Sequence, residues 1–365
     1  MPRDPREPLE AIVLVGGQGT RLRPLTLSAP KPLLPTAGVP FLAHLLARAA
    51  AGGVTHVVLA TCYKADMFAA CFGDGSAFGL SIGYVQEDVP LDTAGGIRNA
   101  AASLRGSGPG DPVVVLNSDV LSGHDLGAQV DLHLKTDAAV TLHLVEVDDP
   151  SRFGVVPTDE SGRVTAFLEK TPNPVTNRIN AGCYVFRREV IGQIPAGRRV
   201  SVERETFPGL IESGQLVMGY PESAYWLDVG TPQTFVRGSC DLVLGKLAAP
   251  LLPGPTGPSL VLDGGSVAPG ASVSGGTLVG AGAAVAAGAT VSGSVLFDDA
   301  AVGADAVVRD SIIGRGAVIA PGAVLDDAVI GDGAYVGPGN ELTRGIRIWP
   351  GVRLEPTSVR FSTDV

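Results

Sequence analysis

Cysteine, aromatic residues and positive charge are all scarce in this chain of 365 residues. The four cysteines are Cys62, Cys71, Cys183 and Cys240, and none of them lies in a C-x-x-C pair or at Cys/His ligand spacing. Neither a disulfide framework nor a zinc site is therefore indicated. We expect the cysteine side chains to be small buried hydrophobes.

The charge balance and the apolar runs exclude further classes of protein. Lysine and arginine together number 27, against 37 aspartates and glutamates, so the formal net charge is −10. Proteins that bind nucleic acid or anionic membranes generally present a basic face, and this acidic excess argues against both partners. The opening "MPRDPREPLE" has no apolar signal core, and no run approaches the roughly 18 apolar residues of a membrane span. We therefore expect a globular, cytoplasmic protein.

From residue 10 to about residue 150, short β-rich runs alternate with helical ones. "AIVLV", "THVVLAT", "LSIGYVQE" and "PVVVLNSD" read as strands, and "PFLAHLLARAAAGG" between the first two reads as a helix with Pro40 in its first turn. Strands that alternate with helices predict an α/β fold with a mostly parallel sheet covered on both faces. Ligands of such sheets bind beyond the carboxyl ends of the strands. Residues 153–168, "FGVVPTDESGRVTAFL", predict a hairpin that turns at "DESG".

The last third of the chain has a different pattern. "LAAPLLPGPTGPS" is rich in Pro and Gly without periodicity, and we interpret residues 247–260 as a linker after a catalytic domain at 1–246. Residues 261–365 then repeat hexapeptides such as "VAPGAS" and "IAPGAV". Such repeats stack one aliphatic side chain per short strand inside a three-sided prism, which predicts a left-handed parallel β-helix. The predicted interior column is Leu296, Val302, Val308, Ile313, Ile319, Leu325, Ile330, Val336 and Leu342.

All five histidines precede the linker, so the tail lacks the base that many hexapeptide-repeat acyltransferases use. We therefore expect the tail to serve in assembly or regulation, and we expect the protein to be a homo-oligomer.

The stretch "IVLVGGQGTRLRPLTLSAPKPLLP" places three glycines, two arginines and one lysine directly after a strand. Glycine lets successive backbone N–H groups surround a phosphate, and cationic side chains neutralise its charge. The letters fit neither a Walker A loop nor a dinucleotide fingerprint, since Leu22 stands where the last glycine of the fingerprint would be. The stretch therefore indicates a phosphate-binding loop of another kind, although a glycine turn followed by a solvated basic loop would give the same letters.

Two aspartates follow strand-like runs, Asp119 in "VVVLNSDV" and Asp228 in "YWLDVG". Either could be only a helix cap or a turn residue. Two carboxylates from separate strands can also hold Mg²⁺ and leave its other positions to water and phosphate oxygens. That combination suits phosphoryl or nucleotidyl transfer, which depends on positioning and charge stabilisation.

The glycine loop, "LNSDV", "FLEK", "INAGCYVF", "SVERETFP" and "WLDVGTP" together resemble the sugar-1-phosphate nucleotidyltransferases. With the hexapeptide tail, the chain is most similar to bacterial mannose-1-phosphate guanylyltransferases. The resemblance covers nearly the whole chain and implies a Rossmann-like catalytic domain. It also implies a Mg²⁺-dependent reaction in which GTP and mannose 1-phosphate give GDP-mannose and pyrophosphate.

The resemblance assigns roles by motif. It implies that Arg21 and Lys31 are catalytic, because they would stabilise the charge that develops on the triphosphate. Asp119 and Asp228 would hold the metal. The implied nucleotide-binding residues are Leu14, Gly16, Gly17, Gly19, Thr20, Gln86, Asp92, Thr93 and Ser118. The implied sugar-phosphate-binding residues are Gly154, Glu169, Lys170 and Asn180; without the resemblance, the pair Glu169–Lys170 would read as a surface ion pair.

Asp92 departs from the usual pattern, because similar guanylyltransferases have glycine at this position. Its carboxylate could accept the two adjacent donors of guanine, or it could mark another specificity, as in uridylyltransferases that handle N-acetylmuramate 1-phosphate. It could also simply cap the helix that begins near Thr93. The sequence therefore leaves open another sugar or pseudo-sugar 1-phosphate with UTP, dTTP or ATP as donor. A catalytically silent regulatory paralogue is a further alternative. The presence of all four catalytic and metal-binding side chains argues against it.

Overall fold

The computed structural model describes residues 8–62 and 64–360, and these residues form two compact units. The first unit comprises the described part of Met1–Gly17 together with Leu45–Trp226, and the second comprises Gln18–His44 together with the described part of Leu227–Val365. The boundary of the units therefore falls inside the glycine loop, after Gly17. The domain boundaries proposed from the sequence remain a prediction.

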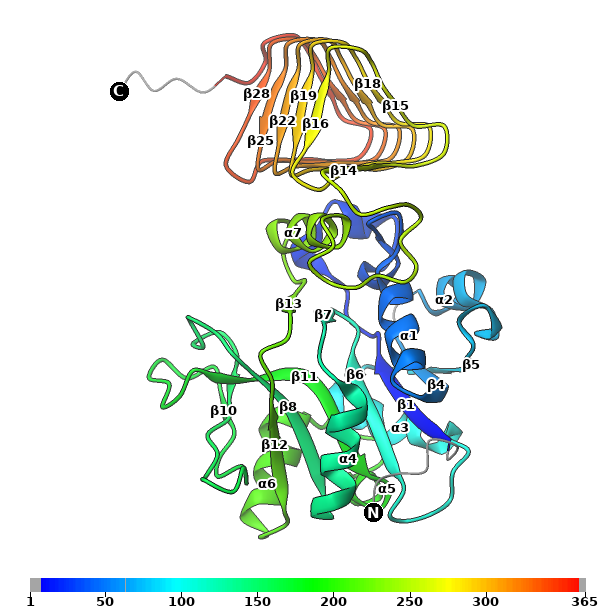
Figure 1. The fold of residues 1–365 in the computed structure, drawn as a ribbon, viewed down its shortest axis with the longest axis vertical. Helices are drawn as coiled ribbons and strands as arrows, with labels where there is room; N and C mark the ends of the chain where they lie inside the picture. The colour runs from blue at the N-terminus through cyan, green and yellow to red at the C-terminus, as the bar shows by residue number, and fades with distance from the viewer. Residues whose placement is uncertain (1–7, 63, 361–365) are drawn as a thin grey trace. The chain divides into compact units, whose positions relative to one another are not determined.

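A mixed sheet forms the centre of the first unit (Figure 1). Its main path runs β10-β9-β11-β6-β1-β4-β5, and β8 pairs with β11 and β12. The pairs β1–β4, β1–β6, β4–β5 and β8–β12 are parallel, whereas β11 is antiparallel to β6 and to β8. The strands of this sheet are β1 (Leu9–Leu14), β4 (Val54–Thr61), β5 (Ser81–Gln86), β6 (Pro112–Asn117), β8 (Val140–Glu146), β9 (Gly154–Val155), β10 (Leu168–Glu169), β11 (Arg178–Arg187) and β12 (Val217–Pro221). Strand β7 (Val120–Ser122) lies outside it.

Side chains alternate between the faces of a strand, and helices cover both faces of this sheet, as predicted. On one face, Ile12 of β1 and Leu142 of β8 join a buried core with Ile97 of α3. On the other face, Thr141 of β8 meets α4, whose His133 ring nitrogen lies 3.0 Å from the Thr141 hydroxyl. The helices are α1 (Phe41–Ala51), α2 (Ala65–Phe72), α3 (Asp92–Ala100), α4 (Leu126–Thr136), α5 (Arg188–Gln193), the π-helix η6 (Val202–Thr206) and α6 (Phe207–Glu212).

The hairpin predicted for residues 153–168 is present. β9 and β10 pair antiparallel, with Gly154 opposite Glu169, and an isolated bridge joins Thr158 to Val164 nearer the turn. The Asp159 carboxylate stabilises the turn by accepting the N–H groups of Ser161 and Arg163.

The second unit begins with the segment that follows the glycines. It folds as three short 3-10 turns followed by a hairpin whose two strands have two residues each. These elements are η1 (Thr20–Leu22), η2 (Leu25–Leu27), η3 (Lys31–Leu33), β2 (Pro35–Thr36) and β3 (Val39–Pro40). Pro40 therefore lies in β3, just before α1, and not in the first helical turn where the sequence placed it. Strand β13 (Trp226–Asp228) and helix α7 (Pro232–Val243) follow later in the chain. Thr231 caps α7, and its hydroxyl accepts the N–H of Thr234.

The rest of the second unit is a stack of short parallel strands in three sheets, which is the arrangement of the predicted left-handed β-helix (Figure 1). Face one contains β14 (Ser259–Val261), β17 (Thr277–Val279), β20 (Val295–Leu296), β23 (Ile312–Ile313), β26 (Val329–Ile330) and β29 (Arg347–Ile348). Face two contains β15 (Ser266–Val267), β18 (Ala284–Val285), β21 (Ala301–Val302), β24 (Val318–Ile319), β27 (Tyr335–Val336) and β30 (Arg353–Leu354). Face three contains β16 (Ser272–Ser274), β19 (Thr290–Ser292), β22 (Val307–Arg309), β25 (Val324–Asp326) and β28 (Glu341–Leu342).

The interior of the β-helix confirms the predicted aliphatic column, because all nine of those side chains are buried. They belong to one core cluster with small alanines such as Ala300 and Ala317 at the corners. Small side chains at the corners let the chain turn tightly between faces while the aliphatic side chains fill the prism.

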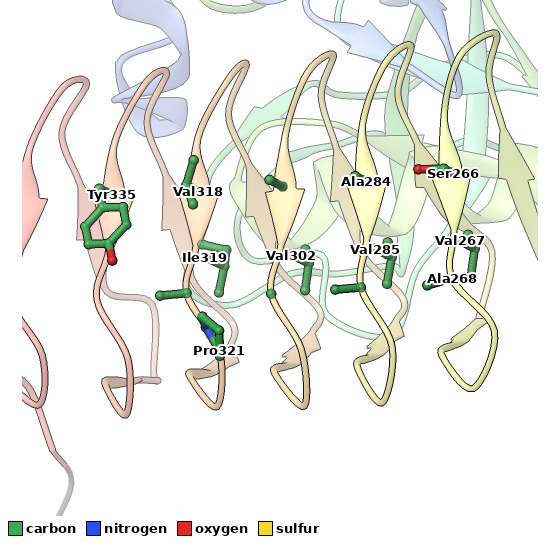
Figure 2. Close-up of a pocket in the computed structure, with 14 residues that line it drawn as sticks. Ser266, Val267, Ala268, Ala284, Val285, Val302, Val318, Ile319, Pro321 and Tyr335 are labelled. Atoms are coloured by element: carbon green, nitrogen blue, oxygen red, sulfur yellow. The ribbon is translucent and has the colours of Figure 1, made fainter.

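Face two of the β-helix is apolar on its outer side (Figure 2). Ala284, Ala301, Val318 and Tyr335 succeed one another along a shallow hollow of about 650 Å³.

Two findings qualify the composition-based expectations. Cys183 and Cys240 are buried as predicted, but Cys62 is only half-buried and Cys71 is exposed. Cys71 is exposed because it lies on the solvent side of α2. Among the described residues, no helix combines the length and the apolar character that a membrane crossing requires.

Candidate functional site

The carboxyl ends of the parallel strands bring several predicted nucleotide-binding residues to one edge of the first unit's sheet. Leu14 ends β1, and exposed Gly16 and Gly17 follow it. The next strand of the sheet, β6, ends at Asn117, and the N–H of Ser118 donates to the Leu14 carbonyl at 3.3 Å. Asp119 is therefore placed beside the end of β1.

Gln86 lies at the same edge, two strands away from β1. It is the last residue of β5 and pairs with Thr61 of β4, and its side chain is exposed. The N–H of Glu87 donates to the Thr61 carbonyl and leads the chain away from the sheet. Burial is the largest influence on the Glu87 carboxyl and raises its pKa above the ordinary value, and Asp92 nearby acts in the same direction.

Asp92 and Thr93 begin α3, and both are engaged by the protein. Asp92 has a backbone φ of 63° and its carboxylate accepts the N–H of Thr93 at 2.8 Å. The Thr93 hydroxyl donates to Glu203 at 2.9 Å and accepts the N–H of Val202 at 2.8 Å. Leu91, not Asp92, is the N-cap of α3, and no side chain caps this end of the helix, so the structure does not support the helix-capping alternative for Asp92. The Thr93 hydroxyl ties α3 to the π-helix η6.

Three of the predicted sugar-phosphate residues, Gly154, Glu169 and Asn180, lie on β9, β10 and β11 of the same sheet, and Lys170 directly follows β10. Gly154 is buried opposite Glu169, and a Cβ added to Gly154 would lie 2.7 Å from the Phe167 ring and 3.1 Å from Glu169 Oε2. Only glycine therefore fits at this position. Glu169 and Lys170 form an ion pair at 3.2 Å, with the Lys170 side chain more exposed than that of Glu169.

Asn180 lies at a β-bulge in β11, where the pairing with β8 shifts between Asn180 and Tyr184. Its side-chain oxygen accepts the N–H of Gly182 at 3.2 Å, and its amide nitrogen donates to the Tyr184 hydroxyl at 2.9 Å. Bulges of this kind re-aim side chains at functional sites, and here the bulge fixes the orientation of the Asn180 amide.

The remaining predicted residues, Gly19, Thr20, Arg21, Lys31 and Asp228, belong to the second unit. Gly19 has a φ of +60°, and a Cβ there would lie 2.9 Å from Thr26 Cγ2 and 3.1 Å from Lys31 Cβ. The Thr26 hydroxyl also donates to the Gly19 carbonyl at 2.9 Å. Gly19 therefore lets the chain return on itself closely enough to bring Lys31 beside Arg21's turn.

Arg21 is exposed in η1, and its guanidinium lies against Gly230. A Cβ at Gly230 would be 2.8 Å from Arg21 Nη2, so this glycine makes room for the arginine. Asp228 ends β13, two residues before Gly230. The second unit therefore brings together a cation of the glycine loop and the segment that carries the second aspartate.

Three residues that the sequence-based prediction left out support these positions. Glu203 holds Thr93, Tyr184 holds Asn180, and Gly230 accommodates Arg21. All three occur in the motifs "SVERETFP", "INAGCYVF" and "WLDVGTP". The motifs were informative, but the hydrogen-bond partners and the close approach are visible only in the folded chain.

No group of three or more His, Cys, Asp or Glu side chains among the described residues is arranged to hold a metal ion. Mg²⁺ commonly takes one or two carboxylates and keeps water and substrate phosphate oxygens as its other ligands. Asp119 and Asp228 have the right chemistry for that role.

Comparison with known protein families decides the class of this fold. Residues 10–243 match the family described as "Nucleotidyl transferase". The chain belongs to this family of nucleotidyl transferases. Residues 256–339 also match the "GMPPB C-terminal domain", which covers most of the β-helix.

Individual nucleotidyl transferases agree with this assignment. The chain is 56% identical over 358 residues to a mannose-1-phosphate guanylyltransferase of Mycobacterium tuberculosis, covering 98% of this chain and 99% of that protein. It is 39% identical to a mannose-1-phosphate guanyltransferase of Candida albicans over 64% of each chain. The crystal structure of HddC from Yersinia pseudotuberculosis complexed with GMP-PN superimposes with a TM-score of 0.56 at 27% identity, over 64% of this chain and 99% of HddC.

Proposed function

We propose that this nucleotidyl transferase is a mannose-1-phosphate guanylyltransferase, which converts GTP and mannose 1-phosphate into GDP-mannose and pyrophosphate. The observation that carries the proposal is the 56% identity to the mycobacterial enzyme of that name over nearly the whole of both chains. The match to the "GMPPB C-terminal domain" extends the similarity through the β-helix.

In the proposed reaction, an oxygen of the sugar phosphate attacks the α-phosphorus of GTP, and pyrophosphate leaves from the opposite side. The attacking phosphate is already ionised near neutral pH, so the protein need not supply a general base. Catalysis then depends on alignment and on stabilising negative charge, as in other phosphoryl transfers. We assign charge stabilisation to Arg21 and Lys31, and the close packing of Gly19 supports their placement in one loop.

We assign the sugar phosphate to Gly154, Glu169, Lys170 and Asn180. The Glu169 carboxylate would accept hydrogen bonds from sugar hydroxyls, and the Lys170 ammonium would contact the phosphate. Close packing at Gly154 and the Asn180 bulge support this assignment, because both hold polar groups in defined orientations. We assign the nucleotide to Leu14, Gly16, Gly17, Gly19, Thr20, Gln86, Asp92, Thr93 and Ser118, of which Asp92 and Thr93 begin α3.

We further propose Mg²⁺ as the cofactor, held by Asp119 and Asp228. A bound Mg²⁺ would neutralise phosphate oxygens and help to orient the leaving pyrophosphate. The protein's own part is to present two carboxylates and to leave the remaining positions to water and substrate. Assembly into a homo-oligomer also remains a proposal.

The substrate assignment is tested by pyrophosphate release with Mg²⁺, crossing GTP, UTP, dTTP, ATP and CTP with mannose 1-phosphate and glucose 1-phosphate. We expect strong release with GTP and mannose 1-phosphate only. Release with another pair would keep the reaction class and reassign the substrates. Silence across the grid would favour a regulatory protein that binds without turnover.

The metal assignment is tested by Asp119→Asn and Asp228→Asn. An amide keeps the size of the carboxylate but loses its charge, so we expect turnover to fall by about a thousandfold or more, because the cation would lose its anchoring charge. Asp131→Asn is the matched control, since Asp131 is exposed on α4. Thermal unfolding should be similar in all three variants, and full turnover in either site variant would remove that residue from the metal site.

A further inference from the structure

The β-helix contacts the loop that carries the two candidate catalytic cations. Arg347 lies at the start of β29, and its Nη1 donates to the carbonyl oxygens of Arg21 and Arg23, at 2.8 Å each. A guanidinium Nη carries two hydrogens, so one nitrogen can serve both acceptors. All of these residues belong to the second unit. A side chain more than three hundred positions away in the sequence thus satisfies two backbone acceptors of the loop.

The loop has little regular structure of its own. It is built from three 3-10 turns of three residues each, and such turns have poor hydrogen-bond geometry and are stable only in short pieces. Its internal bonds include Leu22 N–H to the Gly19 carbonyl and Arg23 N–H to the Thr20 carbonyl. A loop of this kind needs outside contacts to keep one conformation.

The later part of the second unit supplies such contacts. Gly230, just before α7, accommodates the Arg21 guanidinium, and the Ser239 hydroxyl of α7 accepts the N–H of Ala37 at 2.9 Å. Arg347 supplies a further contact from the β-helix itself. Helix α7 also contacts the β-helix, because Gln233 of α7 donates a hydrogen bond to Asp327 of the β-helix at 2.8 Å.

We propose that Arg347 is a positioning residue for nucleotidyl transfer, which holds the backbone at Arg21 and Arg23 so that the Arg21 side chain stays aligned. The inference rests on the proposed function, because it takes Arg21 and Lys31 as the groups that stabilise the triphosphate. It gives the β-helix a direct role in turnover in addition to any role in assembly.

The physical basis is that charge stabilisation depends steeply on geometry. Displacing a reacting or stabilising group by about 1 Å can cost as much as a hundredfold in rate. A hydrogen bond from a charged donor restrains the loop more strongly than a neutral one would. Without Arg347, two carbonyls would turn to water, and the Arg21 side chain would sample positions that do not match the transition state.

The test compares Arg347→Ala with Arg347→Lys, and Arg353→Ala serves as the matched control. Arg353 lies on another face of the β-helix and stacks over Tyr335 at 4.0 Å, so its removal takes the same charge from the prism without touching the loop. We expect Arg347→Ala to lower kcat by roughly ten- to a hundredfold while KM for mannose 1-phosphate changes by less than about threefold. Arg347→Lys should recover part of the loss, and Arg353→Ala should match the unmodified protein.

Hydrogen exchange followed by mass spectrometry separates local loosening from unfolding. In Arg347→Ala, peptides that contain Leu22 and Arg23 should exchange faster, while peptides from the β-helix interior keep their protection. Loss of protection in the β-helix as well would overturn the proposal, because the lost activity would then reflect a damaged fold.

A double variant distinguishes positioning from a general effect. If Arg347 acts through Arg21, adding Arg347→Ala to Arg21→Ala should cost less than about twofold more in single-turnover rate, since coupled residues are not additive. A full additional loss, or unchanged kcat in Arg347→Ala alone, would overturn the proposal. Failure of the proposed function has a different signature: the unmodified protein would release no pyrophosphate from GTP and mannose 1-phosphate, while the exchange experiment would still show whether Arg347 restrains the loop.

Discussion

Gly154 shows how a single missing side chain can define a subsite. An added Cβ would lie 2.7 Å from the Phe167 ring and 3.1 Å from Glu169 Oε2. We predict that Gly154→Ala displaces the Glu169 carboxylate, raises KM for mannose 1-phosphate about tenfold with a smaller change in kcat, and lowers the free energy of unfolding by about 1–3 kcal/mol through overpacking. Steady-state kinetics and urea unfolding measure the two effects.

Gly192→Ala is the control for Gly154→Ala. Gly192 lies in α5, and no atom other than its chain neighbours and the helix backbone lies within 4 Å of its added Cβ. Alanine is favoured over glycine inside a helix by about 0.5–1 kcal/mol, so this variant should be as stable as the unmodified protein or slightly more stable. Equal KM values in both glycine variants would show that Gly154 does not shape the sugar-phosphate subsite.

The sequence located the candidate residues better than it described their surroundings. The resemblance assigned Asp92 and Thr93 to the nucleotide, but the sequence did not show that the Thr93 hydroxyl bonds to Glu203 and Val202. These partners lie more than a hundred positions away, and a short motif carries no information about contacts at that separation. The expectation that Cys71 is buried was wrong for the same reason, because the packing of the folded chain decides which side of α2 faces solvent.

At the level of elements, the β-helix contains a ladder of buried hydroxyls beside its aliphatic column. The Ser294 hydroxyl donates to the Ser292 carbonyl at 2.8 Å and accepts the N–H of Ser311 at 3.1 Å. Ser311 accepts the N–H of Ala328 from the next coil in the same way, at 3.0 Å. Each hydroxyl therefore joins one coil to the next at a corner where the chain turns.

We predict that Ser294→Ala lowers the free energy of unfolding by about 1–3 kcal/mol, because it leaves the buried N–H of Ser311 without its acceptor. Ser272→Ala is the comparison, since Ser272 is exposed on β16 and its loss should change stability by less than about 0.5 kcal/mol. Denaturant unfolding monitored by circular dichroism would compare the two variants. Equal stability would mean that water or a backbone shift satisfies the Ser311 N–H.

Elements with a strong periodic signal were predictable, and the others were not. The strands of the sheet and the β-helix column follow from β-rich runs and from aliphatic side chains at steps of six, six and five residues. The π-helix η6 and the bulge at Asn180 show no such period. The π-helix is stabilised by a hydrogen bond to Thr93, and the bulge by a hydrogen bond between Asn180 and Tyr184. The segment 18–44 is a similar case: it follows β1 closely in sequence but belongs to the second unit.

For the whole molecule, the first unit and the β-helix differ in how they bury titratable groups. The first unit encloses His124, His133 and His143, and burial is the largest influence in lowering the pKa of His143 to about 2 and those of the other two to about 4. The rings of His124 and His143 stack 4.0 Å apart. The β-helix has no histidine, and burial raises the pKa of its Asp310, so that acid does not destabilise the β-helix through this group.

These shifts predict that acid weakens the first unit before the β-helix. The unfolded chain protonates its histidines below about pH 6.5, whereas the folded unit keeps them neutral to about pH 4. The stabilising effect of the neutral histidines is therefore complete above about pH 6.5 and falls as the pH drops, by up to about 1.4 kcal/mol per pH unit for each histidine.

The two tryptophans report separately on the first unit and on the β-helix, because Trp226 packs on Phe153 in the first unit and Trp349 lies in the β-helix. In urea unfolding at about pH 7 and about pH 5, the Trp349→Phe variant should lose more stability on acidification than the Trp226→Phe variant. His143→Leu should flatten the pH dependence of the Trp226 signal, and equal losses in both tryptophan variants would show that the buried histidines do not govern acid stability.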